Sequence, residues 1–204
     1  MRPESDLAPA GVLAVVLAAG GGSRFTGSTH KLLAERDGRA VVDYAVEAAV
    51  AGIGRVLVVT GATPLPDSVV ASPAVRIVHH PGWAEGQATT LAAAIAVAER
   101  ERNIEAVVVG LGDQPSIPPD AWRSVAASTA PIAVATYEGR RRNPVRLHRS
   151  VWPLLPTSGD EGARAVMRLR ADLVKEVPCN GSPDDIDTLE DLLRWQRKSS
   201  TNSP

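Results

Sequence analysis

A glycine triplet followed by two basic residues is the first feature of the chain that could do chemistry. The segment "LAAGGGSRFTGSTHK" runs from Leu17 to Lys31, directly after the apolar run "GVLAVV". Glycines lack a Cβ and adopt positive φ values, so successive backbone N–H groups can converge on an anion. Arg24 can then neutralise phosphate through a planar fork, and Lys31 as a point charge. These residue types predict a phosphate-binding loop, with a glycine-rich turn that binds nothing as the alternative.

Two common phosphate loops do not fit this segment. A Walker A loop requires G-x-x-x-x-G-K-[ST], and although Gly22 and Gly27 have the right separation, Ser28 stands where the lysine belongs. The dinucleotide fingerprint G-x-G-x-x-G fails because Phe25 stands in place of the third glycine.

Carboxylates follow a second apolar run and precede the last helical segment. The run "VVVGLGDQP" ends at Asp113, and "DDIDTLEDL" supplies Asp184, Asp185 and Asp187. Mg²⁺ prefers a few carboxylate oxygens, with its remaining positions taken by water and substrate phosphates, so Asp113 is a candidate metal ligand. The alternatives are a turn cap ahead of Pro115 and a solvated acidic lead-in to the last helix.

Two further segments carry polar groups suited to ligands. "WAEGQATTL" places Gly86 and Gln87 at a helix start, where backbone N–H groups are free and a glutamine amide can both donate and accept. Arg140, Arg141 and Arg142 could attract an anionic second substrate, or form a solvated basic turn between two strands.

The elements that position these residues alternate in type, as in βαβ units with a mainly parallel sheet. We expect strands at 12–18, 55–61, 75–80, 105–112 and 131–137, and helices at 40–52, 86–102 and 118–128. The second half predicts a strand at 143–148, short helices at 151–155 and 162–170, and a last helix at 188–198 with Thr188 as its N-cap. Ligands of open α/β sheets bind at the carboxyl ends of the strands, where the glycine triplet and Asp113 both fall.

The bulk composition favours one globular domain. The 204 residues suffice for a single core, and we expect that domain at 11–197, between a flexible N-terminal arm at 1–10 and a flexible tail at 198–204. A net charge of -1 gives no support to a nucleic-acid partner. No apolar stretch approaches the roughly 20 residues that span a bilayer, so we expect no membrane partner. The single Cys179 and the absence of a basic-apolar leader favour a cytoplasmic location.

The order of these motifs resembles a known family. "LAAGGGSR…KLL" is similar to the L-A-A-G-x-G-x-R…K signature of the MobA-like nucleotidyltransferases, which include the molybdenum cofactor cytidylyltransferases, although "FTGSTH" is a longer spacer than the family's usual one. "GDQP", "DIDTLEDL" and "GQATTL" resemble the family's D-x-P, D-I-D-T-P-E-D-L and G-Q-x-x-S-L segments, with Leu189 in place of proline and Thr90 in place of serine. "GRRRNPV" and "TSGDEGAR" resemble two cytidylyltransferase segments. The resemblance implies an α/β, Rossmann-like (GT-A-type) nucleotidyltransferase fold, a mostly parallel sheet with helices on both faces.

The same resemblance implies a role for each matching residue. Arg24, Lys31 and Asp113 would be catalytic, and Mg²⁺ would be bound by Asp113 and Asp187, with Asp185 as a second candidate. The nucleotide would be bound by Leu17, Ala18, Ala19, Gly20, Gly21, Gly22, Arg24, Lys31, Gly86, Gln87, Thr90 and Gly112. The acceptor would be bound by Gln114, Pro115, Asn143, Pro144, Asp160, Gly162 and Arg164.

The implied reaction is nucleotidyl transfer from an NTP to a phosphorylated acceptor, with release of pyrophosphate. The L-A-A-G form of the loop favours CTP over GTP, and molybdopterin-type cofactor as the acceptor, with a molybdoenzyme or chaperone as recipient of the product. Two alternatives stay open. One is a nucleotidyltransferase of the same fold that acts on a sugar or alcohol phosphate, and the other is a non-catalytic nucleotide-binding protein that delivers a cofactor.

Overall fold

The computed structural model describes residues 9–200, and of residues 198–200 only the backbone. The expected arm at 1–10 and tail at 198–204 therefore fall mainly outside the described residues. Among the helices within residues 9–200, none has the length and apolarity needed to cross a membrane.

Seven strands form one sheet in the order β5–β4–β1–β6–β8–β7–β9. They are β1 Val12–Ala18, β4 Val56–Thr60, β5 Val75–His79, β6 Ala106–Leu111, β7 Ile132–Tyr137, β8 Arg140–His148 and β9 Val174–Pro178. Only β8 runs antiparallel to its neighbours β6 and β7, and every other pairing within this sheet is parallel. The mostly parallel α/β sheet predicted from the sequence is confirmed.

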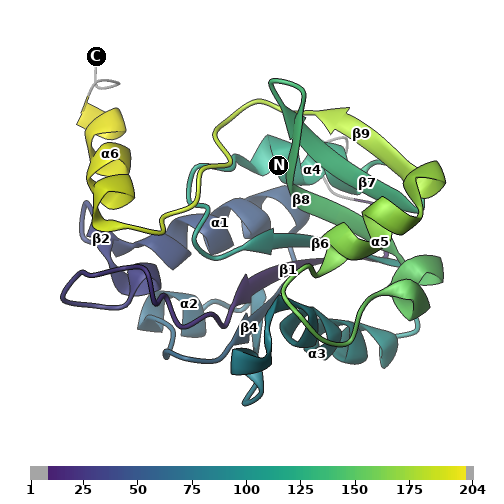
Figure 1. Cartoon of the computed structure of the whole chain (residues 1–204), viewed down its shortest axis with the longest axis horizontal. Coiled ribbons are helices and arrows are strands. Elements are labelled where there is room, and N and C mark those ends of the chain that lie inside the picture. The colour runs from purple at the N-terminus through teal and green to yellow at the C-terminus, as the bar shows by residue number, and fades with distance from the viewer. Residues whose placement is uncertain (1–8, 201–204) are drawn as a thin grey trace.

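Helices cover both faces of the sheet (Figure 1). On one face α1 (Val41–Ile53) and α4 (Pro119–Ala126) pack with Ala14 and Val16 of β1. On the other face α3 (Gln87–Glu99) and α5 (Ala163–Leu169) pack with Leu13 and Val15. Because β1 is buried on both faces, its sequence is continuously apolar rather than alternating.

The central strands bring two predicted motifs to one edge. In the parallel pair β1–β6, Leu17 lies opposite Leu111, so both strands end at the same level. The Gly112 N–H then donates to the Leu17 carbonyl at 2.9 Å. The glycine triplet that follows β1 therefore lies beside Asp113, which follows β6.

Four of the elements differ from the sequence-based expectation. The hairpin of β2 (Glu35–Arg36) and β3 (Arg39–Ala40), and the one-turn helix α2 (Asp67–Val70), were not predicted. Strand β8 begins at Arg140 and not at residue 143, so the three arginines pair with β7 and do not form a turn. Arginine has little intrinsic strand preference, and cross-strand pairing with β7 decides their conformation.

The last helix, α6 (Leu189–Ser200), lies beside the β2–β3 hairpin (Figure 1). The Arg36 guanidinium carbon lies 3.9 Å from the centroid of Trp195 and 4.5 Å from that of Tyr44. The two rings meet edge to face, and cation–π contact with both holds α6 against the hairpin. Thr188 and Asp191 cap α6 reciprocally, with the Asp191 N–H donating to Thr188 Oγ1 and the Thr188 N–H donating to Asp191 Oδ2. The predicted N-cap is confirmed.

We expect Trp195→Ala to lower the free energy of unfolding by about 3 kcal/mol, because Trp195 is 5% exposed and anchors α6. Asp187 lies two residues before the first residue of this helix, so turnover should fall as well. Chemical denaturation checks the first result. Leu193→Ala, on the exposed side of the same helix, is the matched control and should change the free energy by less than about 0.5 kcal/mol. Equal losses in the two variants would contradict an anchoring role for Trp195.

Candidate functional site

Two adjoining cavities lie at the carboxyl ends of the central strands. The first, of about 550 Å³, is called the glycine-loop cavity. It is lined by every residue predicted to bind nucleotide except Gly112, and also by Ser23, Leu32, Trp83, Ala84, Leu111, Asp113, Asp160 and Asp187. The second, of about 650 Å³, is called the α5 cavity, and its lining includes Gln114, Asn143, Gly162, Arg164 and Asp185. The two cavities share Leu17, Gln87 and Leu111.

Four predicted residues lie elsewhere than expected. Gly112 is buried beneath the glycine-loop cavity, where an added Cβ would come within 3.2 Å of the Ala18 Cβ. Pro115 and Pro144 are buried and line neither cavity. Asp160, predicted on the acceptor side, lines the glycine-loop cavity. Gly112, Pro115 and Pro144 are thus placed to support the walls from behind.

The long spacer after Arg24 folds back onto the glycine loop. The His30 Nδ1 accepts from the Leu32 N–H, so its Nε2 carries the proton and donates to the Gly20 carbonyl at 3.0 Å. Gly22 has φ +62°, and a Cβ there would come within 3.1 Å of the His30 ring. The inserted residues therefore return the chain to the cavity at Lys31.

We expect His30 to make stability depend on pH. Burial lowers the pKa of the His30 imidazole, against the opposing effect of the hydrogen bond to Gly20. At pH values between that lowered pKa and about 6.5, the unfolded chain binds more protons than the folded chain. The free energy of unfolding therefore falls as the pH drops through this range. Urea unfolding at a series of pH values measures this pH dependence of the free energy of unfolding. His30→Asn should remove this part of the pH slope, and His79→Asn, outside both cavities, should keep it.

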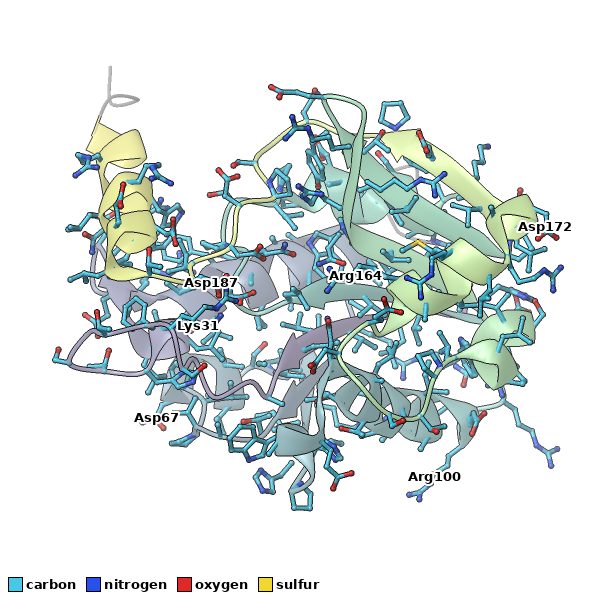
Figure 2. All side chains as sticks on the ribbon, viewed as in Figure 1. Lys31, Asp67, Arg100, Arg164, Asp172 and Asp187 are labelled. Carbon is cyan, nitrogen blue, oxygen red and sulfur yellow. The ribbon has the colours of Figure 1, made fainter. Side chains whose placement is uncertain are left out.

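A lysine joins the two carboxylates predicted to bind metal. Lys31 Nζ lies 2.6 Å from Asp113 Oδ2 and 2.8 Å from Asp187 Oδ1, and Figure 2 shows Lys31 next to Asp187. Burial alone would lower the pKa of Lys31, but the two carboxylates raise it above its ordinary value. Arg24 Nη2 lies 2.9 Å from Asp187 Oδ2 and is largely exposed. The site thus gathers two cations and two anions from three segments of the chain.

The two acidic segments pair with each other and divide their side chains between the cavities. The Ile186 N–H donates to the Asp113 carbonyl at 2.9 Å, and Ile186 itself is buried against α6. Asp113 and Asp187 line the glycine-loop cavity, whereas their near neighbours Gln114 and Asp185 line the α5 cavity. Asp185 and Asp187 are two positions apart in a segment that is not a regular strand, so strand alternation does not explain why they line different cavities.

Asp185 is in a different electrostatic environment from Asp187. Its Oδ1 accepts from Gln114 Nε2 at 2.8 Å. Burial raises the pKa of Asp185 to about 6, and the negative charges of Asp113 and Asp187 add to this effect. Asp185 lines the α5 cavity and not the glycine-loop cavity, where Asp187 lies.

The donor set at Asp113 and Asp187 fits a hard divalent ion. Asp113 Oδ1 is buried and has no hydrogen-bond partner within residues 9–200. The two carboxylates are close enough to share one ammonium group. Over the same residues there is no group of three or more His, Cys, Asp or Glu side chains that could hold a metal. An ion at this pair would need its remaining ligands from water and substrate, which is the mode that Mg²⁺ prefers.

Trp83 lines the glycine-loop cavity and was not singled out in the sequence. It lies on a short 3-10 helix, Trp83–Glu85, immediately before Gly86. A Cβ on Gly21 would come within 3.0 Å of its ring, and one on Gly61 within 2.6 Å. Both glycines therefore make room for the indole. The letters "WAEG" next to the recognised "GQ" were the signal that could have identified it.

The chain belongs to the MobA-like NTP transferase domain family, whose model matches residues 14–176. This identifies the glycine loop and the Asp113 segment as parts of a nucleotidyltransferase-family domain, as the order of motifs predicted.

The names of individual relatives describe different activities. The chain is 30% identical over 197 residues to nicotine blue oxidoreductase of Paenarthrobacter nicotinovorans, a match that covers 90% of this chain and 95% of that protein. The crystal structure of Rv0371c from Mycobacterium tuberculosis H37Rv is similar with a TM-score of 0.74 and 26% identity, over 91% of this chain and 97% of that one. A nucleotidyl transferase from Methanothermobacter thermautotroptrophicus (Mth528) shares the fold, with a TM-score of 0.76 and 22% identity over 94% and 99%.

Proposed function

We propose that this protein is a Mg²⁺-dependent nucleotidyltransferase that transfers CMP from CTP to a phosphorylated acceptor of the molybdopterin type. The observation that carries the proposal is the pair of adjoining cavities with Asp113 and Asp187 on the side of the glycine loop. One cavity has the basic, glycine-lined wall expected of a triphosphate site. The α5 cavity is large enough for a second substrate, and it adjoins the glycine-loop cavity at Leu17 and Leu111, which line both.

The residues of the glycine-loop cavity have roles that follow from charge and position. Backbone N–H groups of Gly20 to Gly22 and the Arg24 guanidinium would bind triphosphate oxygens. A Mg²⁺ ion held by Asp113 and Asp187 would supply positive charge to the reacting phosphates. Lys31, released from these carboxylates, would neutralise a phosphate oxygen.

In this reaction the protein positions the substrates and stabilises the developing charge, and it forms no covalent bond to them. An oxygen of the acceptor phosphate forms a bond to the α-phosphorus of CTP. The bond from that phosphorus to the bridging oxygen breaks, and pyrophosphate leaves with the electron pair.

The floor of the α5 cavity favours a ring-bearing acceptor over a sugar or alcohol phosphate. Aliphatic side chains of the sheet form it, including Val109, Val134 and Val145. Sugar hydroxyl groups placed against such a surface would lose hydrogen bonds to water without replacement. The faces of a planar ring carry no such groups.

A second candidate function is oxidoreductase activity. It is favoured by the 30% identity to nicotine blue oxidoreductase over 90% of the chain. A nucleotide-sized cavity beside one with an aliphatic floor could hold a nicotinamide dinucleotide next to an organic electron acceptor. Folds of this kind host unrelated chemistries, so the site must be tested directly.

One experiment separates the candidates. The purified protein is incubated with Mg²⁺, molybdopterin and CTP, GTP, ATP or UTP in turn, and pyrophosphate release is measured. We expect release with CTP above the other nucleotides, and none without Mg²⁺. A parallel assay follows oxidation of NADH and NADPH in the presence of a quinonoid dye. Dye reduction without pyrophosphate release would replace the proposal by the second candidate, and CTP binding without either reaction would support the cofactor-delivery alternative.

A further inference from the structure

Two side chains that line the glycine-loop cavity lie outside its phosphate and metal groups. Trp83 and Asp160 line this cavity, but neither belongs to the glycine triplet, its basic residues or the carboxylates joined by Lys31. Trp83 is half-buried. A Cβ on Gly61 would come within 2.6 Å of its Cγ, and one on Gly21 within 3.0 Å of its Cζ3. The indole therefore forms a wall of the cavity next to the glycine loop, and an indole face is a surface on which a nucleobase can stack.

The loop that precedes α5 holds Asp160 against the start of α3 (Figure 1). The Ala88 N–H donates to the Gly159 carbonyl at 2.8 Å. Gly86 has φ +111°, and a Cβ there would come within 2.6 Å of Asp160 Oδ1, so a glycine at this position makes room for the carboxylate. The Gly86 N–H in turn donates to the Trp83 carbonyl at 3.3 Å. Trp83 and the Asp160 carboxylate thus adjoin the same residue of the cavity wall.

Within residues 9–200, the Asp160 carboxylate has neither a hydrogen-bond donor nor a cation as its partner. Its neighbour Glu161 lines the α5 cavity instead and is paired with Arg168 at 2.6 Å. A carboxylate only accepts hydrogen bonds, and it repels the phosphates that the glycine loop would bind. The groups of a nucleotide that can donate to Asp160 are therefore on its nucleoside part, namely the sugar hydroxyls and the amino group of the base.

We infer that Trp83 and Asp160 form a subsite that selects the base of the nucleotide: the indole stacks on the base, and the carboxylate accepts a hydrogen bond from its amino group. This inference rests on the proposed function, because it places the nucleotide in the glycine-loop cavity. A base stacked on the indole presents its edge to the side, where Asp160 lies beside Gly86. Cytosine carries a 4-amino group on its edge, whereas uracil carries a carbonyl oxygen, which would face a second acceptor. Asp160 then determines the choice of CTP over UTP and does not bind the acceptor, as its sequence motif predicted.

The first test compares CTP with UTP, which have rings of the same size and differ only along one edge of the base. Binding to the full chain is measured by calorimetry with Mg²⁺ and without an acceptor. We expect CTP to bind about tenfold more tightly than UTP, because the uracil carbonyl cannot donate to Asp160 and Asp160 is exposed rather than fully buried. Equal affinities would overturn the inference.

Asp160→Asn replaces an oxygen acceptor by a donor and keeps the size of the side chain. Its amide can donate to the uracil carbonyl, so the ratio of CTP to UTP affinity should fall about tenfold, to about one. Glu161→Gln, at the adjacent exposed position that lines the other cavity, is the matched control and should keep the wild-type ratio. An unchanged ratio in Asp160→Asn would contradict the inference. A change in the ratio of CTP to 2′-deoxyCTP alone would also contradict it, because the carboxylate would then bind the sugar.

Trp83→Leu tests the stacking. Loss of the ring should weaken the binding of CTP and UTP alike by about tenfold and leave their ratio unchanged. Trp83→Phe also loses part of the packing against Gly61 and Gly21 but keeps an aromatic face, so its affinities should stay within about threefold of the wild type. Equal losses in the two variants would mean that the indole only supports the glycine loop, and the stacking role would be excluded.

These outcomes are separate from those of the proposed function. Binding that prefers CTP and depends on Asp160, without pyrophosphate release in the turnover assay, would remove the proposed transfer and leave the subsite standing. Pyrophosphate release by the wild type, together with an unchanged ratio of CTP to UTP affinity in Asp160→Asn, would remove the subsite alone.

Discussion

Replacing Asp113 by asparagine is expected to reduce pyrophosphate release by about a thousandfold, or about 4 kcal/mol in the activation free energy. Asparagine keeps the shape of the side chain but removes the negative charge that would hold a divalent ion beside the α-phosphate. Asp113 Oδ2 binds Lys31, whereas the buried Asp113 Oδ1 has no hydrogen-bond partner within the described part of the chain, so one oxygen of this carboxylate is left for an ion.

The variant must stay folded for this result to bear on catalysis. We expect its free energy of unfolding to change by less than about 2 kcal/mol, because Lys31 keeps its contact with Asp187. Thermal shifts with CTP should lose their Mg²⁺ dependence in Asp113→Asn and keep it in the control Asp172→Asn. Asp172 is exposed, pairs with Arg170, and lies at the far end of the molecule from Asp187 (Figure 2). Full turnover in Asp113→Asn would exclude a metal-binding role for this residue.

Much of the sheet and the location of the site could be predicted because they depend on local patterns. Apolar runs identify buried strands, and parallel strands that end together must place their following loops together. The segments after Leu17 and Leu111 were therefore expected to meet, and they do. The relative order of motifs was enough to identify the family.

The remaining features depend on contacts between distant segments. Which aspartate faces the glycine loop follows from the Ile186 hydrogen bond to Asp113, 73 positions away in the numbering of the chain. The position of α6 depends on Arg36 and Trp195, which no local pattern connects. Gly86 has φ +111°, and a Cβ there would come within 2.6 Å of the Gly159 carbonyl oxygen. The sequence contained each partner but no signal that paired them.

The contacts of Lys31 predict two opposite effects of one substitution. In Lys31→Met the carboxylates of Asp113 and Asp187 lose the ammonium group that now lies between them. A divalent ion no longer competes with that group, so we expect Mg²⁺ to bind at least about tenfold more tightly in the absence of nucleotide, since one charge-assisted hydrogen bond contributes about 1.5–3 kcal/mol. Turnover should nevertheless fall about a hundredfold, because the reacting phosphates lose a positive charge.

The combination separates this role from a purely structural one. Calorimetric titration with Mg²⁺ measures the first effect, and pyrophosphate release with CTP and molybdopterin measures the second. Lys175→Met, on the exposed strand β9, is the matched control and should leave both unchanged. Two carboxylates without a cation repel each other, so Lys31→Met should also be less stable in a chelator and regain stability with Mg²⁺. Weaker Mg²⁺ binding in this variant would mean that the lysine positions the two carboxylates for the ion and does not compete with it.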